Sequence, residues 1–263
     1  MGMKPTLCSP SLLNDQEFRE GICGSFFAIT RCERSPKESS WSLVENLKLL
    51  EAWSANAHQD FRKIATFSTP RAGTILFEEE QYPTCALLVL KGQVRLYFNS
   101  SDGKRFFLRI ARAGEFIGLN SIFTGSPYQM VAEAEYCIIA STPRSAFLDF
   151  IERYPPVWMS LCHQLSRQAD QACLRLRTLG LAQCTTSKLA RLIVEWCADG
   201  YLTQHGIRIH LPLTHGEIGE CIGASRETIT RILGELQRRN MIQMRGTVLT
   251  IIDRSALDNC AGF

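Results

Sequence analysis

The sequence predicts an α+β protein in three successive parts: an antiparallel, jelly-roll-like β-roll, one long helix, and a C-terminal winged helix-turn-helix. Three observations predict this order. Short β-rich runs separated by glycines occupy about residues 64–141, a long helical pattern occupies about 157–180, and two short helical patterns followed by a hairpin occupy 213–252. We therefore divide the chain into an N-terminal extension (1–55), a β-roll (56–143), a linker and long helix (144–182) and a C-terminal domain (183–263).

The composition is that of a globular protein and excludes several classes. Of 263 residues, 45% are hydrophobic and 21% are charged, and the net charge of +3 is too small to indicate a nucleic-acid partner by itself. The longest apolar run, 85–90, is far shorter than the roughly 20 residues that span a bilayer, and the N-terminus lacks the apolar core of a signal peptide. We expect a cytoplasmic protein without membrane contact.

A reducing compartment disfavours a disulfide framework among the 11 cysteines. Buried thiols, Fe–S ligands and a redox switch remain open. Zinc-ligand spacing, a nucleophile–base motif and a phosphate-binding glycine loop are not apparent, so the sequence predicts neither a zinc site nor an enzyme.

The β-roll is predicted from five apolar runs that alternate with turn signals. A helical pattern after Ser39-Ser40, including Leu47 and Leu50, precedes them. The expected strands are 75–77, 87–90, 94–98, 106–110 and 131–139, with Lys91-Gly92 and Ser101-Asp102-Gly103 as turns. This spacing of short strands is typical of an all-β sandwich or barrel.

The long helix carries a heptad pattern. A short helix, 145–153, ends before Pro155-Pro156, and apolar positions then recur at alternating steps of four and three. The predicted dimerisation seam is Leu161, Leu165, Gln168, Ala172, Arg175 and Leu179, with one polar and one basic position, and Leu176 strengthens its edge. Burial of this stripe against the chain's own β-roll is the alternative.

The C-terminal domain shows the signals of a helix-turn-helix. Thr214 and Glu217 fit a capping box that begins the first helix. Gly223 permits a left-handed backbone at its end, and Ser225 caps the second helix. The pattern 241–252, around Arg245-Gly246-Thr247, predicts a β-hairpin wing whose tip can meet phosphates.

The start of the second helix carries side chains that can read DNA bases. Arginine can hold guanine O6 and N7 in a bidentate contact, and glutamate can accept from cytosine N4. Because the glycine turn, both caps and the wing occur together, we favour double-stranded DNA as the partner over a solvated, salt-bridged helix face. The predicted DNA-binding residues are Thr214, His215, Ser225, Arg226, Glu227, Thr228, Thr230 and Arg231.

These motifs resemble the CRP/FNR superfamily of bacterial transcription regulators. The resemblance rests on 218–219, 222–223, 225–229 and 231–233, and extends upstream to Phe77, Lys91-Gly92 and 114–118. It covers about residues 60–255 and leaves the first 55 or so unexplained. The resemblance implies a signal-responsive homodimer that regulates transcription with RNA polymerase as a partner, and a palindromic TGTGA-like site read by Arg226, Glu227 and Arg231.

The resemblance also places an effector pocket in the β-roll. The corresponding residues are Gly114, Glu115, Gly118, Leu119, Tyr128 and Gln129. In the cyclic-AMP-binding branch a ribose-binding glutamate falls at Leu119, and a phosphate-binding Arg-Ser pair falls near Tyr128-Gln129. Burying a phosphate against tyrosine and glutamine without a cation is costly, so cyclic nucleotide binding is disfavoured.

This segment is more similar to the FNR branch, whose oxygen sensors bind an Fe–S cluster through N-terminal cysteines and one β-roll cysteine. The candidate redox or Fe–S set here is Cys8, Cys23, Cys32 and Cys137, although the spacing departs from that branch. On a β-strand, packing as a small core residue is the alternative for Cys137. The cofactor therefore stays unknown. The rival functions are a cofactor- or small-molecule-binding redox sensor without sequence-specific DNA binding, and a cysteine enzyme.

Overall fold

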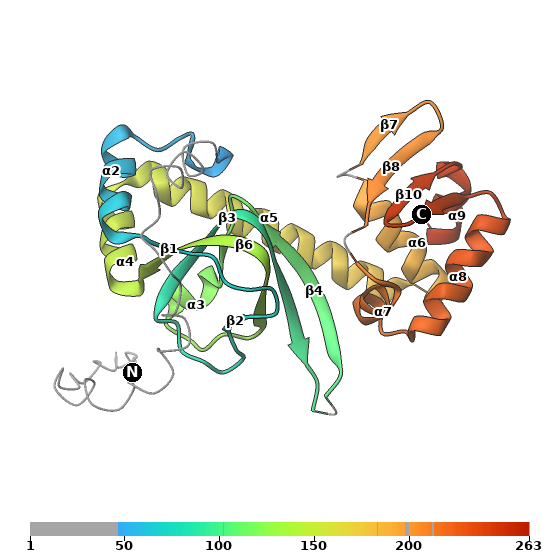
Figure 1. Cartoon of the computed structure of the whole chain (residues 1–263), viewed down its shortest axis with the longest axis horizontal. Helices are drawn as coiled ribbons and strands as arrows, with labels where there is room; N and C mark the ends of the chain where they lie inside the picture. Colours follow the sequence, from blue (N-terminus) through green and yellow to red (C-terminus); the bar gives the residue numbers. More distant parts are fainter. Residues whose placement is uncertain (1–46, 102, 183, 198–199, 212, 263) are drawn as a thin grey trace, which may run out of the picture. The chain divides into compact units, whose positions relative to one another are not determined.

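The computed structural model describes residues 47–101, 103–182, 184–197, 200–211 and 213–262 (Figure 1). The described chain begins with a 3-10 turn η2 (Lys48–Leu50) and helix α2 (Ala55–Ile64). Ser54 caps α2 by accepting a hydrogen bond from the backbone N–H of Ala57 at 3.2 Å. The first part of the helix expected after Ser39-Ser40 lies outside the described residues, and its described end is the short turn η2 instead of a long helix.

The β-roll is a six-stranded antiparallel sheet. Its strands run in the order β1-β6-β3-β4, with β2 paired to β6 and β5 paired to β3. The elements are β1 (Thr66–Ser68), β2 (Ile75–Phe77), β3 (Cys85–Asn99), β4 (Arg105–Arg112), β5 (Phe116–Ile117), helix α3 (Leu119–Thr124) and β6 (Val131–Pro143). The predicted antiparallel β-roll is confirmed.

One detail of the predicted strands was wrong. The expected turn at Lys91-Gly92 does not separate two strands, because β3 continues through it and pairs with β6 on both sides across a bulge. Gly92 has φ 77°, and a Cβ built on it would lie 2.0 Å from the Tyr136 carbonyl oxygen. Glycine is therefore required here for close strand approach as well as for its backbone conformation.

Two hydrophobic clusters hold this half of the chain. Inside the roll, Phe77, Val89, Ile117 and Ile139 belong to one cluster. The second cluster joins the sheet to the surrounding helices and includes Phe61, Phe116, Phe147, Phe150 and Leu161. The β-roll is thus anchored to helices that precede and follow it in the sequence.

Helix α4 (Arg144–Arg153) leads to the 27-residue helix α5 (Pro155–Leu181). At 1.5 Å per residue, α5 is about 40 Å long. Gln164 on α5 is 2% exposed and clamps the backbone of Phe116: its Oε1 accepts from the Phe116 N–H at 3.0 Å, and its Nε2 donates to the Phe116 carbonyl at 2.6 Å. These contacts fix which face of α5 turns toward the β-roll.

The predicted dimerisation seam was partly wrong. Leu161 is fully buried within the chain's own β-roll cluster, and Leu165 packs against the same cluster. Gln168 is also partly buried, whereas Ala172 and Leu176 are exposed and Leu179 is intermediate. The predicted seam therefore follows the border between the buried and the exposed face of α5. Apolar residues occur on both faces, so the pattern alone does not separate them.

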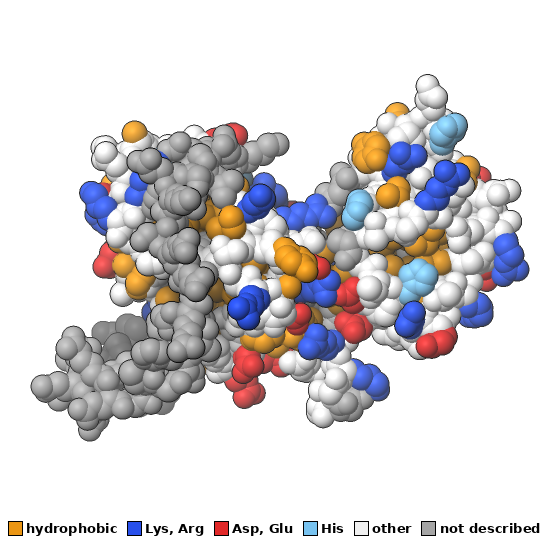
Figure 2. All heavy atoms as spheres, viewed as in Figure 1, with side chains coloured by type: hydrophobic (Ala, Val, Ile, Leu, Met, Phe, Trp, Pro, Cys, Tyr) orange, Lys and Arg blue, Asp and Glu red, His pale blue; other side chains and the backbone are white. Residues whose placement is uncertain are grey.

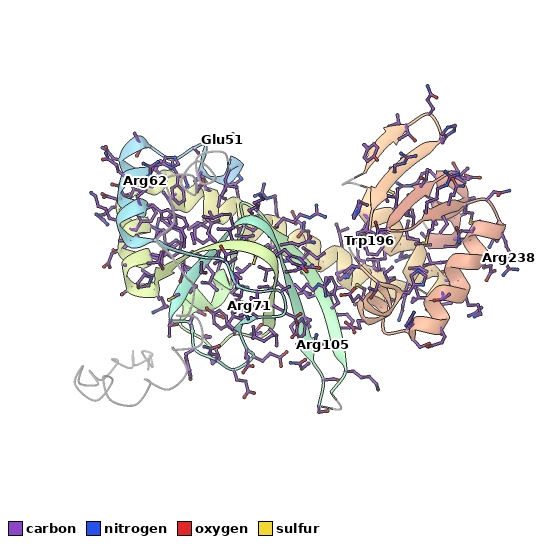
Figure 3. The ribbon with its side chains drawn as sticks, viewed as in Figure 1. Glu51, Arg62, Arg71, Arg105, Trp196 and Arg238 are labelled. Carbon is purple, nitrogen blue, oxygen red and sulfur yellow. The ribbon has the colours of Figure 1, made fainter. Side chains whose placement is uncertain are left out.

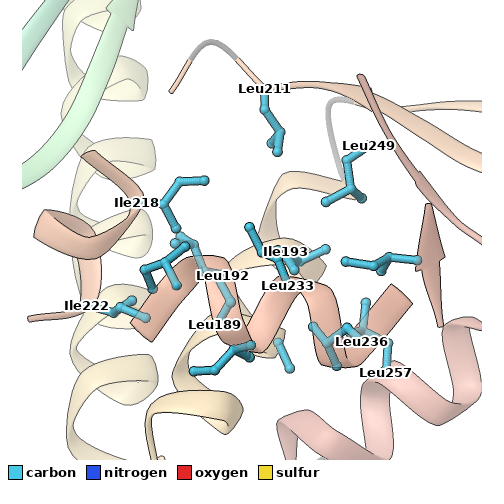
Figure 4. Packing of buried hydrophobic residues seen from close by; sticks show 14 of the residues in the cluster. Leu189, Leu192, Ile193, Leu211, Ile218, Ile222, Leu233, Leu236, Leu249 and Leu257 are labelled. Atoms are coloured by element: carbon cyan, nitrogen blue, oxygen red, sulfur yellow. The ribbon is translucent and has the colours of Figure 1, made fainter. Parts of the chain in front are cut away.

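The C-terminal domain begins at helix α6 (Thr185–Trp196). Then follow β7 (Tyr201–Thr203), β8 (Gly206–His210), α7 (His215–Ile222), α8 (Arg226–Arg238), β9 (Ile242–Arg245), β10 (Val248–Ile251) and α9 (Arg254–Ala261). The strands form a sheet in the order β7-β8-β10-β9. Side chains from α6, α7, α8, α9 and the sheet meet in one core, part of which is drawn in Figure 4.

Strand β7 and helix α9 have no clear signal in the sequence. Strand β7 has only three residues, two of them exposed, so it lacks an alternating pattern. Helix α9 is capped by Asp253 and buries only Leu257 and Ala261, which is too little periodicity to identify it. Within the described ranges, none of the helices combines the length and apolar character needed to cross a membrane.

Candidate nucleic-acid interface

The first helix of the helix-turn-helix is fixed at its start by a reciprocal capping box. The Thr214 Oγ1 accepts from the Glu217 N–H at 3.3 Å, and Glu217 Oε2 accepts from the Thr214 N–H at 2.7 Å. Ile218, Cys221 and Ile222 are buried on the inner face of α7. The capping box and the buried face together fix the position of the exposed Thr214 at the start of α7.

A tight glycine turn joins α7 to α8. Gly223 has φ 69° and ψ 42°, the left-handed conformation that ends α7. Earlier in α7, Gly219 lies so close to the turn that a Cβ on it would be 2.3 Å from the Ala224 carbonyl oxygen. The Gly219 backbone carbonyl accepts from the Ala224 N–H at 2.9 Å. This close approach fixes the relation between the two helices.

Helix α8 has one buried and one exposed face. Its N-cap, Ser225, accepts from the Thr228 N–H at 3.2 Å. The buried face consists of Ile229, Ile232, Leu233 and Leu236. The opposite face, at the N-terminal end, exposes Ser225, Arg226, Glu227, Thr230 and Arg231, while Thr228 is intermediate. The structure therefore brings these predicted residues together on one exposed surface at the start of α8.

His215 connects the two helices at this surface. Its Nδ1 lies 2.9 Å from the Thr230 Oγ1, and that hydroxyl also donates to the Arg226 carbonyl at 2.9 Å. A histidine from the first turn of α7 thus touches the exposed face of α8. The two elements present His215 and Thr230 as one continuous polar surface.

The charged side chains at the start of α8 are available for external contacts. Within the described ranges, neither Arg226 nor Arg231 forms a salt bridge, in contrast to Arg175 with Glu195 and Arg254 with Asp258. Hydrogen bonds from its own backbone N–H and from Ser225, aided by the charge of Arg226, lower the pKa of Glu227. Glu227 is therefore an anion at neutral pH, the state that accepts hydrogen bonds.

A wing stands beside the helix-turn-helix. Strands β9 and β10 pair with Arg245 opposite Val248, and Gly246 at the tip has φ 60°. The exposed Thr247 hydroxyl lies 3.1 Å from His210 Nε2, a support for the tip that the sequence gives no means of finding. A cavity of about 260 Å³ has Thr214 and His215 from the start of α7 and Gly246 and Thr247 from the wing tip among its lining residues.

On the face drawn in Figure 2, the basic side chains of the C-terminal part, in blue, form separate groups. Arg238, at the far end of α8, projects outward in Figure 3. This distribution fits the small net charge of +3. The surface depends on a few placed side chains more than on a broad basic field.

Among the predicted effector residues, Gly118 and Tyr128 lie together inside the β-roll. Tyr128 is 5% exposed, and its ring stacks on Phe77 with centroids 3.8 Å apart and an interplanar angle of 13°. A Cβ on Gly118, whose φ is 71°, would lie 2.5 Å from the same ring. The tyrosine ring therefore fills the interior of the roll at the position where the resemblance places a phosphate-binding pair.

The remaining effector candidates point to different surroundings. Leu119 is 2% exposed and belongs to the helix-side cluster, whereas Gln129 is exposed. Glu115 forms a salt bridge with Arg109 at 2.5 Å, and the N–H of the adjacent residue Gly114 donates to the Val89 carbonyl. Burial and strand pairing give these residues different surroundings, and a shared effector pocket stays a prediction.

Of the candidate redox set, Cys8, Cys23 and Cys32 lie outside the described residues. Cys137 is 1% exposed in the β-roll core, and burial raises the pKa of its thiol. Within the described part of the chain, no group of three or more metal-ligating side chains converges. The position of Cys137 is that of a packed core residue.

Two family models match the chain. Residues 69–154 match the cyclic nucleotide-binding domain, and residues 187–260 match the Crp-like helix-turn-helix domain. The first falls on the β-roll with α4, and the second on the C-terminal domain.

Curated relatives cover most of the chain. The global nitrogen regulator of Synechocystis sp. is 30% identical over 195 residues, which cover 71% of this chain and 84% of that protein. The cAMP-activated global transcriptional regulator CRP of Salmonella typhimurium is 25% identical over 184 residues, covering 69% of this chain and 87% of the relative.

Solved structures share the fold. A CooA mutant from Carboxydothermus hydrogenoformans superposes with a TM-score of 0.70 at 20% identity, covering 82% of this chain and 94% of that chain. FixK2 from Bradyrhizobium japonicum gives a TM-score of 0.64 at 23% identity, covering 75% and 97%. With a β-roll, a long helix and a capped helix-turn-helix in this order, the chain belongs to the CRP/FNR superfamily of transcription regulators.

Proposed function

We propose that this protein is a homodimeric regulator that binds a palindromic, TGTGA-like DNA site through α8 and changes its DNA affinity in response to a signal. Arg226, Glu227 and Arg231 read base edges in the major groove. The polar residues around them, Thr214, His215, Ser225, Thr228 and Thr230, position the helix on the phosphate backbone. The wing tip at 245–247 adds a further backbone contact.

The observation that carries this proposal is the exposed start of α8. The cap at Ser225 and the buried face of the helix hold this turn in place, while Arg226 and Arg231 lack a salt-bridge partner among the described residues. A solvated, salt-bridged helix face would pair these arginines with neighbouring carboxylates. Unpaired guanidinium groups on a rigid helix are suited to bidentate contacts with guanine.

A two-fold dimer explains why the site would be palindromic. Two copies of α8 must meet successive major grooves, so their half-sites lie one helical turn, about 34–36 Å, apart. Communication with the β-roll would pass through α5 and the short connection 182–184 to α6, where Ala182 and Cys184 have extended backbones. A signal would shift the balance between two arrangements of these parts. Such a regulator acts in the cytoplasm, with RNA polymerase as a further partner.

The signal is not a cyclic nucleotide in this proposal. The stacked Tyr128 and Phe77 rings occupy the space, and burying a phosphate there without a cation is unfavourable. We expect cyclic AMP and cyclic GMP to leave both the melting temperature and the DNA affinity unchanged. A rise in melting temperature with increasing nucleotide would contradict this part of the proposal.

Fluorescence anisotropy with a TGTGA palindrome and a scrambled duplex of equal length tests the DNA-binding role. The wild-type protein should prefer the palindrome, with a Kd that rises steeply with salt. Arg231→Ala should cost about 1–3 kcal/mol on the palindrome and relax specificity at one base pair.

Arg238→Ala is the matched control, because it removes the same charge from the exposed far end of α8. It should weaken binding to both duplexes by similar, small factors. Equal losses for Arg231→Ala on both duplexes would show that Arg231 contacts phosphate only. Equal affinity of the wild-type protein for the two duplexes would contradict sequence-specific binding.

A further inference from the structure

Helix α5 exposes a second heptad stripe, which shares only Leu176 with the predicted seam. Its positions are Met159, Cys162, Ser166, Ala169, Cys173, Leu176 and Gly180, separated by alternating steps of three and four. All seven are exposed, Met159 at 61% and Leu176 at 70%. None carries a charge, although charged residues such as Arg167 and Asp170 lie close by in the helix.

The opposite face of α5 is already occupied. Val157, Leu161, Gln164 and Thr178 are buried, and Gln164 is hydrogen-bonded to Phe116. The helix cannot turn the exposed stripe inward without breaking these contacts. An uncharged stripe with this heptad spacing is suited to packing against a second helix of the same pitch.

We propose that this stripe packs against the same stripe of a second copy, and that Cys162 and Cys173 each form a disulfide with their own counterpart in that copy. The inference rests on the proposed homodimer. In a parallel, in-register pair of helices, equivalent heptad positions face each other across the two-fold axis. The parallel arrangement follows from the palindromic site, which requires both DNA-binding domains at the same end of the α5 pair.

The distances across such a pair suit a disulfide. Ser166 and Ala169, between the two cysteines, are small and permit close helix approach. Helix axes pack about 8–10 Å apart and Cα atoms lie about 2.3 Å from each axis, which leaves about 3.4–5.4 Å between facing Cα atoms. Positions beside the line of closest approach are somewhat farther apart. This range overlaps the roughly 4.4–6.8 Å between Cα atoms in disulfides.

The oxidant in this step is a hydroperoxide. One thiolate attacks the peroxide oxygen, which gives a sulfenic acid and releases water or alcohol. The facing thiolate then attacks the sulfenic sulfur, so that the S–S bond forms and the sulfenic oxygen leaves as water. Two thiols lose two protons and two electrons in total, and the peroxide is reduced by two electrons. Cys162 and Cys173 are both exposed in the single chain, so peroxide can reach either sulfur.

The experiment treats full-length protein with a few equivalents of hydrogen peroxide, blocks remaining thiols with N-ethylmaleimide, and resolves the products on a non-reducing gel. Peptide mapping by mass spectrometry identifies the linked cysteines. The variants are Cys162→Ser, Cys173→Ser and the double substitution. The matched control is Cys184→Ser, which removes an exposed thiol outside α5. Sedimentation velocity in reducing buffer measures the dimer independently.

The wild-type protein and Cys184→Ser should give a dimer band that disappears on reduction and maps to Cys162–Cys162 and Cys173–Cys173 links. Each single variant should keep a dimer band through its remaining cysteine, and the double variant should lose it. A band that persists in the double variant, or one that maps to Cys162–Cys173 links and is lost in either single variant, would overturn the inference. A non-covalent dimer without any crosslink would overturn the disulfide while the proposed dimer stands. A monomer in sedimentation would contradict both.

Discussion

Replacing Gly219 by alanine tests whether the close approach of α7 to the turn holds the helix-turn-helix together. The new Cβ would lie 2.3 Å from the Ala224 carbonyl oxygen, where ordinary van der Waals contacts are 3.4–4 Å. The obstacle is backbone, so no side-chain rotation relieves it. The turn before α8 must move by about an ångström, or α7 must tilt.

The magnitude follows from two opposing effects. Overpacking costs about 1–3 kcal/mol, and the upper end applies because a rigid turn is displaced. Alanine is better than glycine inside a helix by about 1 kcal/mol. The free energy of unfolding should therefore fall by about 2 kcal/mol in Gly219→Ala. Gly234→Ala is the matched control, because no atom lies within 4 Å of its Cβ position in α8, so it should gain stability by up to about 1 kcal/mol.

Urea unfolding followed by far-UV circular dichroism measures this difference of about 3 kcal/mol, on the order of 100-fold in the folding equilibrium. Anisotropy with the palindromic duplex should also show weaker binding by Gly219→Ala, because the displaced turn moves the start of α8. Gly234→Ala should bind as the wild-type protein does. If Gly219→Ala were as stable as Gly234→Ala and bound DNA normally, the reasoning from the turn geometry would be refuted.

Three further substitutions or labelling experiments test other parts of the structure. Gln164→Leu should lower the free energy of unfolding by about 2 kcal/mol or more, because the buried N–H and C=O of Phe116 lose their hydrogen bonds of 3.0 and 2.6 Å to Gln164. An unchanged melting temperature would contradict this role of Gln164. Tyr128→Ala should cost about 3–5 kcal/mol in denaturant unfolding through the cavity it leaves, whereas Tyr128→Phe should cost less than about 1 kcal/mol, because the hydroxyl makes only a 3.4 Å contact with the Cys85 carbonyl. Iodoacetamide at pH 7.5 should label Cys184 before Cys221. Hydrogen bonds from Ser187 lower the pKa of Cys184 and so raise its thiolate fraction, whereas burial raises the pKa of Cys221 to about 12. Peptide mapping that found the reverse order would contradict these surroundings.

The local signals of the C-terminal domain were readable from the sequence because each depends on residues a few positions apart. The capping box at Thr214 and Glu217 and the N-cap at Ser225 are decided within one helical turn, and the structure contains both. The apolar face of α8 follows from the helical period alone. The start and orientation of the recognition helix could therefore be predicted without knowledge of the rest of the fold.

The β-roll interior could not be predicted in this way. Whether Gly92 ends a strand or lets it continue depends on the Tyr136 backbone, more than forty residues later in the chain. The stacking of Tyr128 on Phe77 likewise depends on two segments that meet only in the folded sheet. The residue types at Tyr128 and Gln129 predict poor phosphate binding because they offer no cation. The structure adds a second reason, which is that the Tyr128 ring itself fills the space beside Phe77.

The error on α5 has a specific physical cause. A helix between the chain's own β-roll and a second copy must bury two faces, so its sequence contains two overlapping apolar patterns. One pattern, with Leu161 and Gln164, faces the β-roll, and the other, with Cys162 and Cys173, lies about 100–180° away around the helix. A single heptad fitted to all apolar positions falls between the two and selects border residues such as Leu165 and Leu179. Periodicity shows that a helix has an apolar stripe, but only the burial of Gln164 against Phe116 decides which part of the stripe is left for a partner.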